Sequence, residues 1–181
     1  VYDLPFETGK TVLIMQGYNG NFSHVNKYAL DFRLRKGKLI CAARGGNVLK
    51  VVEHNNIGGA NIKYINHGNY VVIDHGDFTF SYYLHLQQYS VDVQVGETVG
   101  AGHQIGRIGN TGYSTEAHLH LEISNGFALG DSIMVLFEEL RNLSGGVPFA
   151  GLNVISQNTN TTLTMSLNYS TCPLDLFSFR G

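Results

Sequence analysis

The stretch Glu116-Ala117-His118-Leu119-His120-Leu121-Glu122-Ile123 alternates polar and apolar residues over its whole length. This period predicts a strand, because successive strand side chains point to opposite faces. One face then carries His118, His120 and Glu122. Two imidazoles and a carboxylate on one face cost stability unless something binds them, so a metal ion is the expected partner. The alternative is a solvated strand face that carries two incidental histidines.

The rest of the composition favours an all-β protein. Among the 181 residues there are 22 glycines, 10 tyrosines and 10 phenylalanines, and helix signals are poor. Within residues 91–109, short apolar units alternate with glycines, which supply the backbone conformations of tight corners. We therefore expect one domain, or one domain with an appendage, built as a compact antiparallel β-sandwich or barrel-sandwich hybrid with extra C-terminal strands.

Charge and hydropathy exclude several classes of function. The formal net charge is −2 and we find no basic stripe, so nucleic-acid binding is not expected. No apolar run is long enough to span a bilayer, and the first residues do not read as a signal peptide. The chain starts at Val1, as expected of a processed or trimmed product. The sequence leaves open whether Cys41 and Cys172 form a disulfide or Cys41 is simply a buried thiol.

Local patterns predict further strands and turns. Residues 70–75 and 78–86 flank a Gly-Asp turn and are expected to form a hairpin, with Tyr83 and His85 on one face. Residues 39–43 and 47–52 are expected to pair as a second hairpin around Arg44-Gly45-Gly46. Residues 131–140 give mixed signals, and we favour a strand over a helix. Residues 161–169 alternate as another strand.

Two isolated polar residues bear on the metal hypothesis. Asp31 stands among apolar residues, so a buried strand there would leave a carboxylate that needs a partner. That partner is either Arg33 or Arg35 in a simple salt bridge, or a shared polar site. His85 is expected to be structural unless its face looks towards His118.

Several short motifs occur in one order along residues 17–125. They are His24 with Tyr28-Ala29-Leu30-Asp31-Phe32, then Ala42-Ala43-Arg44-Gly45-Gly46, Tyr83-Leu84-His85-Leu86, Val95-Gly96-Glu97-Thr98-Val99, Gly109-Asn110-Thr111-Gly112-Tyr113-Ser114 and His118-Leu119-His120-Leu121-Glu122. In this order they resemble the lysostaphin and LytM-type zinc peptidases, also called the glycyl-glycine or β-lytic metallopeptidases. The fold implied by the resemblance is the β-sandwich of the LytM type.

The resemblance also implies roles for individual residues. It makes His24, Asp31 and His120 the ligands of one Zn2+ per chain, and His85 and His118 the catalytic histidines. Six residues separate His24 from Asp31, whereas many members of the family have three in between. We interpret the difference as a loop insertion.

Zinc chemistry fits this donor set. Two imidazoles and one carboxylate leave the fourth tetrahedral position of zinc open for water, whose pKa zinc lowers from about 16 to roughly 7. The helical motif His-Glu-x-x-His is absent, so a histidine is the expected base. We assign His118 as the general base and His85 as proton donor or oxyanion stabiliser, two roles that can be exchanged. Tyr18 matches a tyrosine that the family places at the transition-state oxygen, and Glu122 is expected to orient a histidine from behind.

The function implied by the resemblance is that of a secreted or cell-envelope zinc endopeptidase. It would cut peptide cross-links of bacterial peptidoglycan at Gly or D-Ala residues. Residues 1–16 are expected to be an N-terminal extension with the first strand, residues 17–125 the peptidase core, and residues 126–181 a C-terminal β extension packed on the core. A monomer without a membrane span is expected.

Three alternatives stay open. One is a zinc-binding module of the same fold that lacks catalysis and acts in binding or signalling. Another is a peptidase for Gly-rich, elastin-like proteins. The last is a carrier or carbohydrate-binding β domain without metal.

Overall fold

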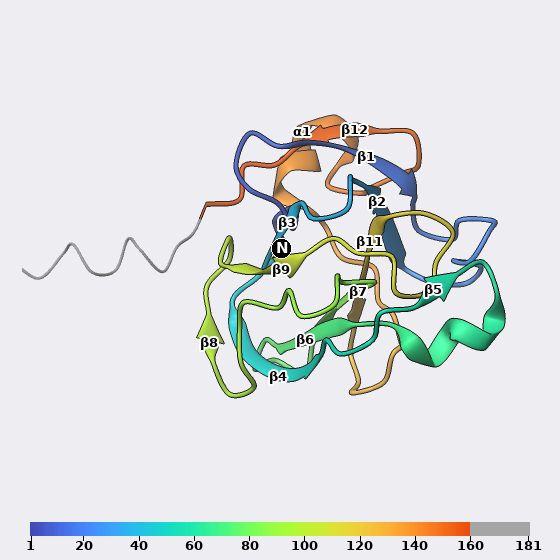
Figure 1. Ribbon diagram of the computed structural model, residues 1–181. Coiled ribbons are helices and arrows are strands. Elements are labelled where there is room, and N and C mark those ends of the chain that lie inside the picture. The colour runs from blue at the N-terminus through green and yellow to red at the C-terminus, as the bar shows by residue number, and fades with distance from the viewer. Residues whose placement is uncertain (160–181) are drawn as a thin grey trace, which may run out of the picture.

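A computed structural model describes residues 1–159 of the chain. Its main element is an eight-stranded sheet with antiparallel neighbours in the order β12-β1-β2-β11-β7-β6-β4-β8 (Figure 1). The strands of this sheet are β1 (Thr11–Gln16), β2 (Ala29–Arg33), β4 (Gly46–Val52), β6 (Tyr70–Asp74), β7 (Phe80–Leu84), β8 (Thr98–Val99), β11 (His118–Ser124) and β12 (Asn153–Ile155).

Smaller elements complete the described part of the chain. β3 (Leu39–Cys41) pairs antiparallel with β9 (Gln104–Arg107), and β5 (Gly58–Gly59) pairs parallel with β10 (Gly112–Tyr113). The helices are η1 (Ile62–His67), η2 (Glu138–Leu140) and α1 (Arg141–Ser144). Every helix in residues 1–159 falls short of the length and apolarity needed to cross a bilayer. The predicted antiparallel all-β class is confirmed, and the sheets of these residues do not close into a barrel.

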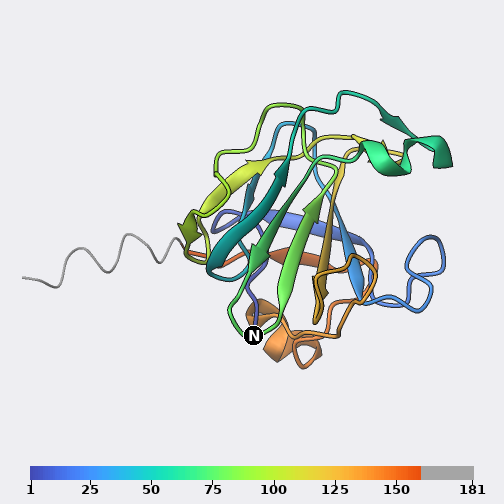
Figure 2. The same cartoon turned by 90° about the horizontal axis from the view of Figure 1, so that it is seen from below.

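One hydrophobic core joins the main sheet to the β3–β9 pair. Phe32, Tyr83 and Leu121 of the main sheet are at most 1% exposed, and so are Ile40 of β3 and Ile105 of β9. Figure 2 shows the long strands of the main sheet side by side. The two sheets form a sandwich because both direct apolar side chains into the same cluster.

β11 lies in the middle of the main sheet, between β2 and β7, and both of its edges are paired. His120 stands opposite Asp31 of β2 on one side and Leu84 of β7 on the other. Leu119 and Leu121, which point to the opposite face, are at most 1% exposed. The alternation predicted for this strand is therefore confirmed.

One predicted hairpin is confirmed and the other is wrong. β6 and β7 pair antiparallel, with Tyr70 opposite Leu84. Residues 39–43 and 47–52 do not pair, because β3 pairs with β9 while β4 pairs with β6 and β8. A Cβ on Gly46 would lie 2.2 Å from the carbonyl oxygen of Asp74, so β4 is pressed against β6. The turn between residues 43 and 47 is thus a corner between two sheets.

The segment 131–140 is not the strand that we predicted. It makes isolated bridges at Ser132 and Phe137 and then enters η2 and α1. Phe137 and Leu140 are buried, and a spacing of three residues suits a helical turn better than a strand. The strand predicted for residues 161–169 and Cys172 lie outside the described residues, among which Cys41 is a buried free thiol.

Phe32→Ala tests the core beneath β2. Phe32 is fully buried, and its ring meets that of Phe6 at 5.2 Å between centroids. We expect urea denaturation to show a loss of about 3–5 kcal/mol in the free energy of unfolding, because the remaining cavity cannot be refilled. Phe78, which is 84% exposed, provides the control. Phe78→Ala should change the free energy by no more than about 0.5 kcal/mol. Equal losses for both variants would contradict the assigned core.

Candidate metal centre

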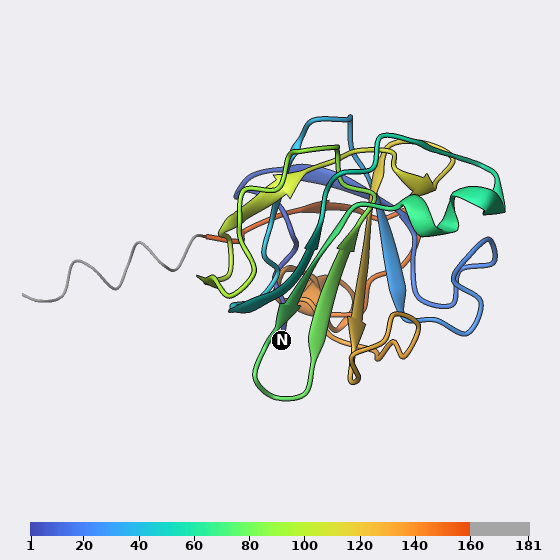
Figure 3. The ribbon, with the colours of Figure 1, turned by 60° about the horizontal axis from the view of Figure 1, so that its bottom comes forward.

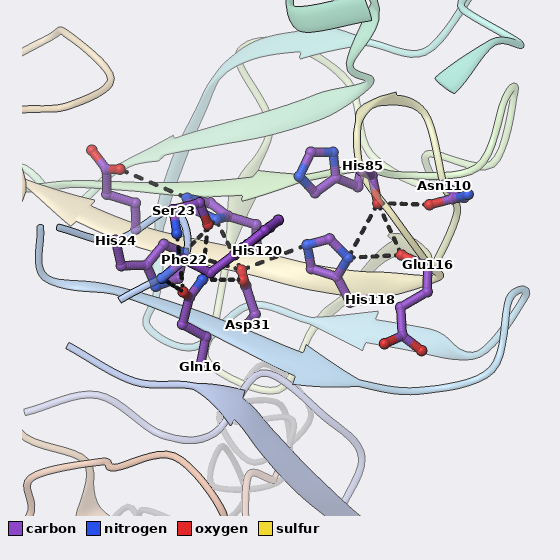
Figure 4. A network of polar contacts seen from close by, with 12 residues as sticks. Gln16, Phe22, Ser23, His24, Asp31, His85, Asn110, Glu116, His118 and His120 are labelled. Atoms are coloured by element: carbon purple, nitrogen blue, oxygen red, sulfur yellow. Dashed lines mark hydrogen bonds and ion pairs between the residues drawn. The ribbon is translucent and has the colours of Figure 1, made fainter. Parts of the chain in front are cut away.

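Separate segments bring histidines and a carboxylate to the face of the main sheet opposite the core. Asp31 comes from β2, while His118 and His120 come from β11. His24 lies in the loop that joins β1 to β2, and His85 directly follows β7. These side chains face one another across the sheet (Figure 4).

Asp31, His24 and His120 form the middle of this group. Asp31 Oδ1 lies 3.0 Å from His120 Nδ1 and 3.3 Å from His24 Nε2. The two nitrogens are 3.3 Å apart. One ligand atom from each residue lies within 4.8 Å of the others, and His24 and Asp31 are buried. Two imidazoles and a carboxylate at this spacing could hold a zinc ion.

The geometry also decides between the partners considered for Asp31. No salt bridge joins Asp31 to Arg33 or Arg35 in the described residues, since Arg33 binds Glu116 at 2.8 Å instead. Of the six residues between His24 and Asp31, the first four form a turn and the last two begin β2, and this path returns the histidine to the carboxylate. The long spacing therefore does not separate the two side chains.

These groups tune one another's protonation. Burial opposes ionisation of Asp31, but hydrogen bonds from His120 and His24 outweigh it and hold the pKa of the carboxyl far below its usual range. Burial likewise opposes a charge on His120, yet its contacts with Asp31 and Glu122 raise its pKa to about 9. The carboxylates of Asp31 and Glu122 therefore face the imidazole nitrogens, and this arrangement favours a bound cation.

His118 and His85 flank this group with their ring centroids 4.7 Å apart. His118 Nδ1 donates to the carbonyl of Glu116 at 2.8 Å, and His85 Nδ1 donates to the carbonyl of Thr111 at 2.7 Å. A carbonyl only accepts, so these partners assign the proton of each neutral ring to Nδ1 and leave Nε2 as a base. Burial, the largest cause, lowers the pKa of His85 to about 3, so its ring is neutral at neutral pH.

His85 reaches this face by leaving the strand. The prediction that Tyr83 and His85 share a face is wrong, because β7 ends at Leu84. His85 has a φ of 65°, which re-aims its side chain towards His118. Tyr83 instead is fully buried, and its hydroxyl accepts a hydrogen bond from the backbone of Ala43.

Two other predicted residues have different positions. The hydroxyl of Tyr18 donates to the carbonyl of Val135 at 2.9 Å, and burial raises its pKa. Tyr18 is not among the residues that line the cavity, and its role at a reacting oxygen stays a prediction. Glu122 does face the centre, because its Oε2 lies 3.7 Å from His120 Nε2 while its Oε1 accepts from the backbone of Gly130.

Gln16 is a residue of this site that sequence reasoning missed. Its Nε2 donates to Asp31 Oδ2 and to Ser23 Oγ, both at 2.8 Å. Its Oε1 accepts from the backbone N–H groups of Phe22 and Ser23 at 3.1 Å. Gln16 thereby ties Asp31 to the segment before His24 and leaves Oδ1 of Asp31 to the histidines. The one available signal was a polar residue at the end of a strand, directly before a polar loop.

The centre opens into a cavity of about 880 Å³. Phe22 from the loop after β1 and Ile62 and Ile65 from η1 line it, together with Tyr113 of β10. Figure 3 shows that loop, drawn in blue, and η1, drawn in green, on the same side of the molecule. Phe22 and Ile62 are 70% and 66% exposed, so apolar walls flank the polar centre. A groove of this kind suits an extended peptide.

Comparison with known proteins gives matches over much of the chain. Residues 25–131 match Peptidase family M23. Glycyl-glycine endopeptidase ALE-1 of Staphylococcus capitis is 32% identical over 113 residues, which are 62% of this chain and 27% of that protein. Peptidoglycan DD-endopeptidase ShyA of Vibrio cholerae serotype O1 is 48% identical over 56 residues, which are 31% of this chain and 13% of that protein. The chain therefore spans less than a third of the length of either relative.

A solved structure matches the fold as well. The catalytic domain of the antimicrobial peptidase lysostaphin from Staphylococcus simulans is 26% identical, with a TM-score of 0.50. The match covers 68% of this chain and 86% of that domain.

Gln16→Ala tests the link between Asp31 and the loop. The variant leaves Asp31 Oδ2 and two backbone N–H groups without their partner, so we expect a loss of about 1–3 kcal/mol in the free energy of unfolding. Hydrogen exchange of the Phe22 and Ser23 amides should become faster. The control is Gln94→Ala, at an exposed position, which should change neither quantity. Unchanged exchange at both amides in Gln16→Ala would refute the link.

Proposed function

Because the chain belongs to peptidase family M23, we propose that it is a zinc-dependent endopeptidase that hydrolyses peptide bonds in the cross-links of bacterial peptidoglycan. The observation that carries this proposal is the meeting of His24, Asp31 and His120 beside two further histidines. Asp31, His120, His118 and His85 line one cavity, and the fully buried His24 lies behind them. Gly-Gly or D-Ala bonds are the proposed targets, since the relatives ALE-1 and ShyA are a glycyl-glycine endopeptidase and a DD-endopeptidase.

We propose His24, Asp31 and His120 as the ligands of one zinc ion. His120 directs Nδ1 to Asp31 and Nε2 to Glu122, so Glu122 can keep a proton on Nε2 and leave Nδ1 to the metal. Gln16 occupies Asp31 Oδ2, which directs the remaining oxygen to the histidines. A bound zinc ion supplies a Lewis acid for the scissile carbonyl and lowers the pKa of water to about 7.

His118 and His85 move the protons in this proposal. His118 Nε2 carries the lone pair and lies 3.6 Å from Asp31 Oδ1, beside the proposed ligands. It takes the proton of the attacking water as the C–O bond forms, and delivers that proton to the amine as the C–N bond breaks. His85, which is neutral, would accept a hydrogen bond from the same water at Nε2 and so orient it for attack. The two roles can be exchanged, because both rings hold their resting proton on Nδ1.

The proposal extends to the setting of the enzyme. A peptidoglycan substrate requires secretion or a place in the cell envelope. We assign the peptidase core to residues 17–125, with extensions on both sides, and a monomer as the working unit. A zinc-binding module without catalysis and a peptidase for Gly-rich, elastin-like proteins are the competing functions, and the experiments below separate them.

Metal analysis tests the proposed ligands. Wild type purified without chelators should carry about one zinc per chain, whereas His120→Ala, His24→Ala and Asp31→Ala should carry almost none, as measured by mass spectrometry of the metal. Glu122→Gln should bind zinc about 10- to 100-fold more weakly. The control is His54→Ala, at an exposed position, which should keep the metal. Wild type without zinc would refute the site.

Turnover tests the catalytic histidines. His118→Ala and His85→Ala should keep zinc but release fragments from purified peptidoglycan about 100- to 10,000-fold more slowly than wild type, because a proton carrier is lost. His54→Ala should keep the wild-type rate. Zinc binding without cleavage of peptidoglycan or of Gly-rich peptides would favour the binding module. Cleavage of Gly-rich proteins alone would favour the elastin-like substrate.

A further inference from the structure

A second cleft, of about 600 Å³, lies at the end of β2. Its basic residues are Lys10, Arg33, Arg35 and Lys38, and we call it the basic cleft. Thr11, Leu34, Glu116 and Ala117 complete its lining. Four of the 12 Lys and Arg residues of the chain fall within residues 33–38, and the fold adds Lys10. This clustering corrects the expectation that the protein has no basic stripe.

The basic cleft continues the face that carries the metal centre. Arg33 follows Asp31 by two residues on β2, so both side chains point to the same face. Arg33 also stands opposite His118 in the pairing of β2 with β11. The two cavities meet at Thr115 and Glu116, since Thr115 lines the larger one and Glu116 the smaller one. In Figure 4, Glu116 lies beyond His118 on the side opposite to His24.

The basic cleft holds an excess of positive charge. Glu116 is its one acidic lining residue, and it is already paired with Arg33 at 2.8 Å. The side chains of Lys10, Arg35 and Lys38 make no ion pair or hydrogen bond within residues 1–159. Three cations therefore face solvent together, directly beside the proposed catalytic groove, in a protein whose net charge is −2. Such a site attracts an anionic group.

We propose that the basic cleft binds a carboxylate of the peptide substrate and thereby selects acidic peptides for cleavage. This inference rests on the proposed endopeptidase function. Asp31 and Arg35 are four residues apart, at most about 14 Å along an extended chain. An extended substrate covers that distance in about four residues, so the selected carboxylate lies two to four residues from the scissile bond.

The position of the basic cleft favours a carboxylate of the substrate, rather than a phosphate polymer, as the group that it binds. A peptide that occupies the catalytic groove runs on into the basic cleft without leaving the sheet face, so its own side chains arrive there at high effective concentration. Guanidinium and ammonium groups bind carboxylates by charge-assisted hydrogen bonds. Because Arg35 and Lys38 are exposed, salt should weaken the selection.

Paired peptides test the inference. Two peptides share a central Gly-Gly bond. The Glu peptide carries one Glu on each side of this bond, two to four positions away, and the Gln peptide carries Gln at the same two positions. For wild type we expect kcat/KM to be about tenfold higher for the Glu peptide at low salt, through KM rather than kcat. Arg35→Gln with Lys38→Gln should remove this preference and leave the Gln peptide unaffected.

Lys50→Gln with Arg141→Gln is the matched control, because it removes the same charge from β4 and α1. It should keep the preference for the Glu peptide. Equal cleavage of both peptides by wild type, or equal losses on both peptides in Arg35→Gln with Lys38→Gln, would overturn the inference. A phosphodiester polymer that competes while the Glu peptide is not preferred would also overturn it, in favour of polyanion docking.

Direct binding separates this inference from the proposed function. If wild type cleaves neither peptide, the endopeptidase proposal fails for this substrate class. Calorimetric titration of the intact Glu and Gln peptides then still tests the basic cleft. Tighter binding of the Glu peptide, lost in Arg35→Gln with Lys38→Gln, supports the cleft without catalysis. Equal binding of the two peptides contradicts it.

Discussion

The register of β11 between β2 and β7 is the constraint on which the site depends. It places His120 opposite Asp31 and puts His118 opposite Arg33. A slip of one residue would turn both histidines into the core and bring Leu119 and Leu121 to the cavity. Burial of those leucines opposes the slip, so the packing of the core also holds the geometry of the candidate metal centre.

The polar face of this sheet is stable because its buried groups satisfy one another. Asp31 gives one oxygen to histidines and the other to Gln16. The carbonyls of Glu116 and Thr111 hold the protons of the two flanking rings. These backbone acceptors belong to the chain segments directly before β10 and β11, so they orient the rings before a ligand arrives. Such preorganisation is what both metal binding and general-base catalysis require.

The same three strands also arrange the surroundings of the centre in order. Exposed apolar residues of the loop after β1 and of η1 flank the candidate metal centre, while cations gather where β2 ends. In the proposed function, a peptide lying along this face meets apolar walls and proton-accepting nitrogens first, and positive charge further on. In that case, the proposed metal ligand Asp31 and the selecting cations Arg35 and Lys38 would follow one another along β2 and the segment directly after it.

The amino-acid sequence by itself determined the antiparallel class, the strand that carries His118 and His120, and the family motifs. The two-residue alternation of polar and apolar side chains and the order of the motifs are properties of the chain itself. Both can be read without knowing which strands lie beside each other in the fold. The sequence also named the three side chains that meet at the centre, because their motifs come as a set.

Only the tertiary structure decided how segments distant in the sequence meet. It turned Tyr18 to Val135, 117 residues away, and it added Lys10 to the cations at the end of β2. It also ended β7 one residue before His85, so that a left-handed residue re-aims the ring. Local periodicity cannot encode these outcomes, because each depends on which side chains from distant segments compete for the same partner or space.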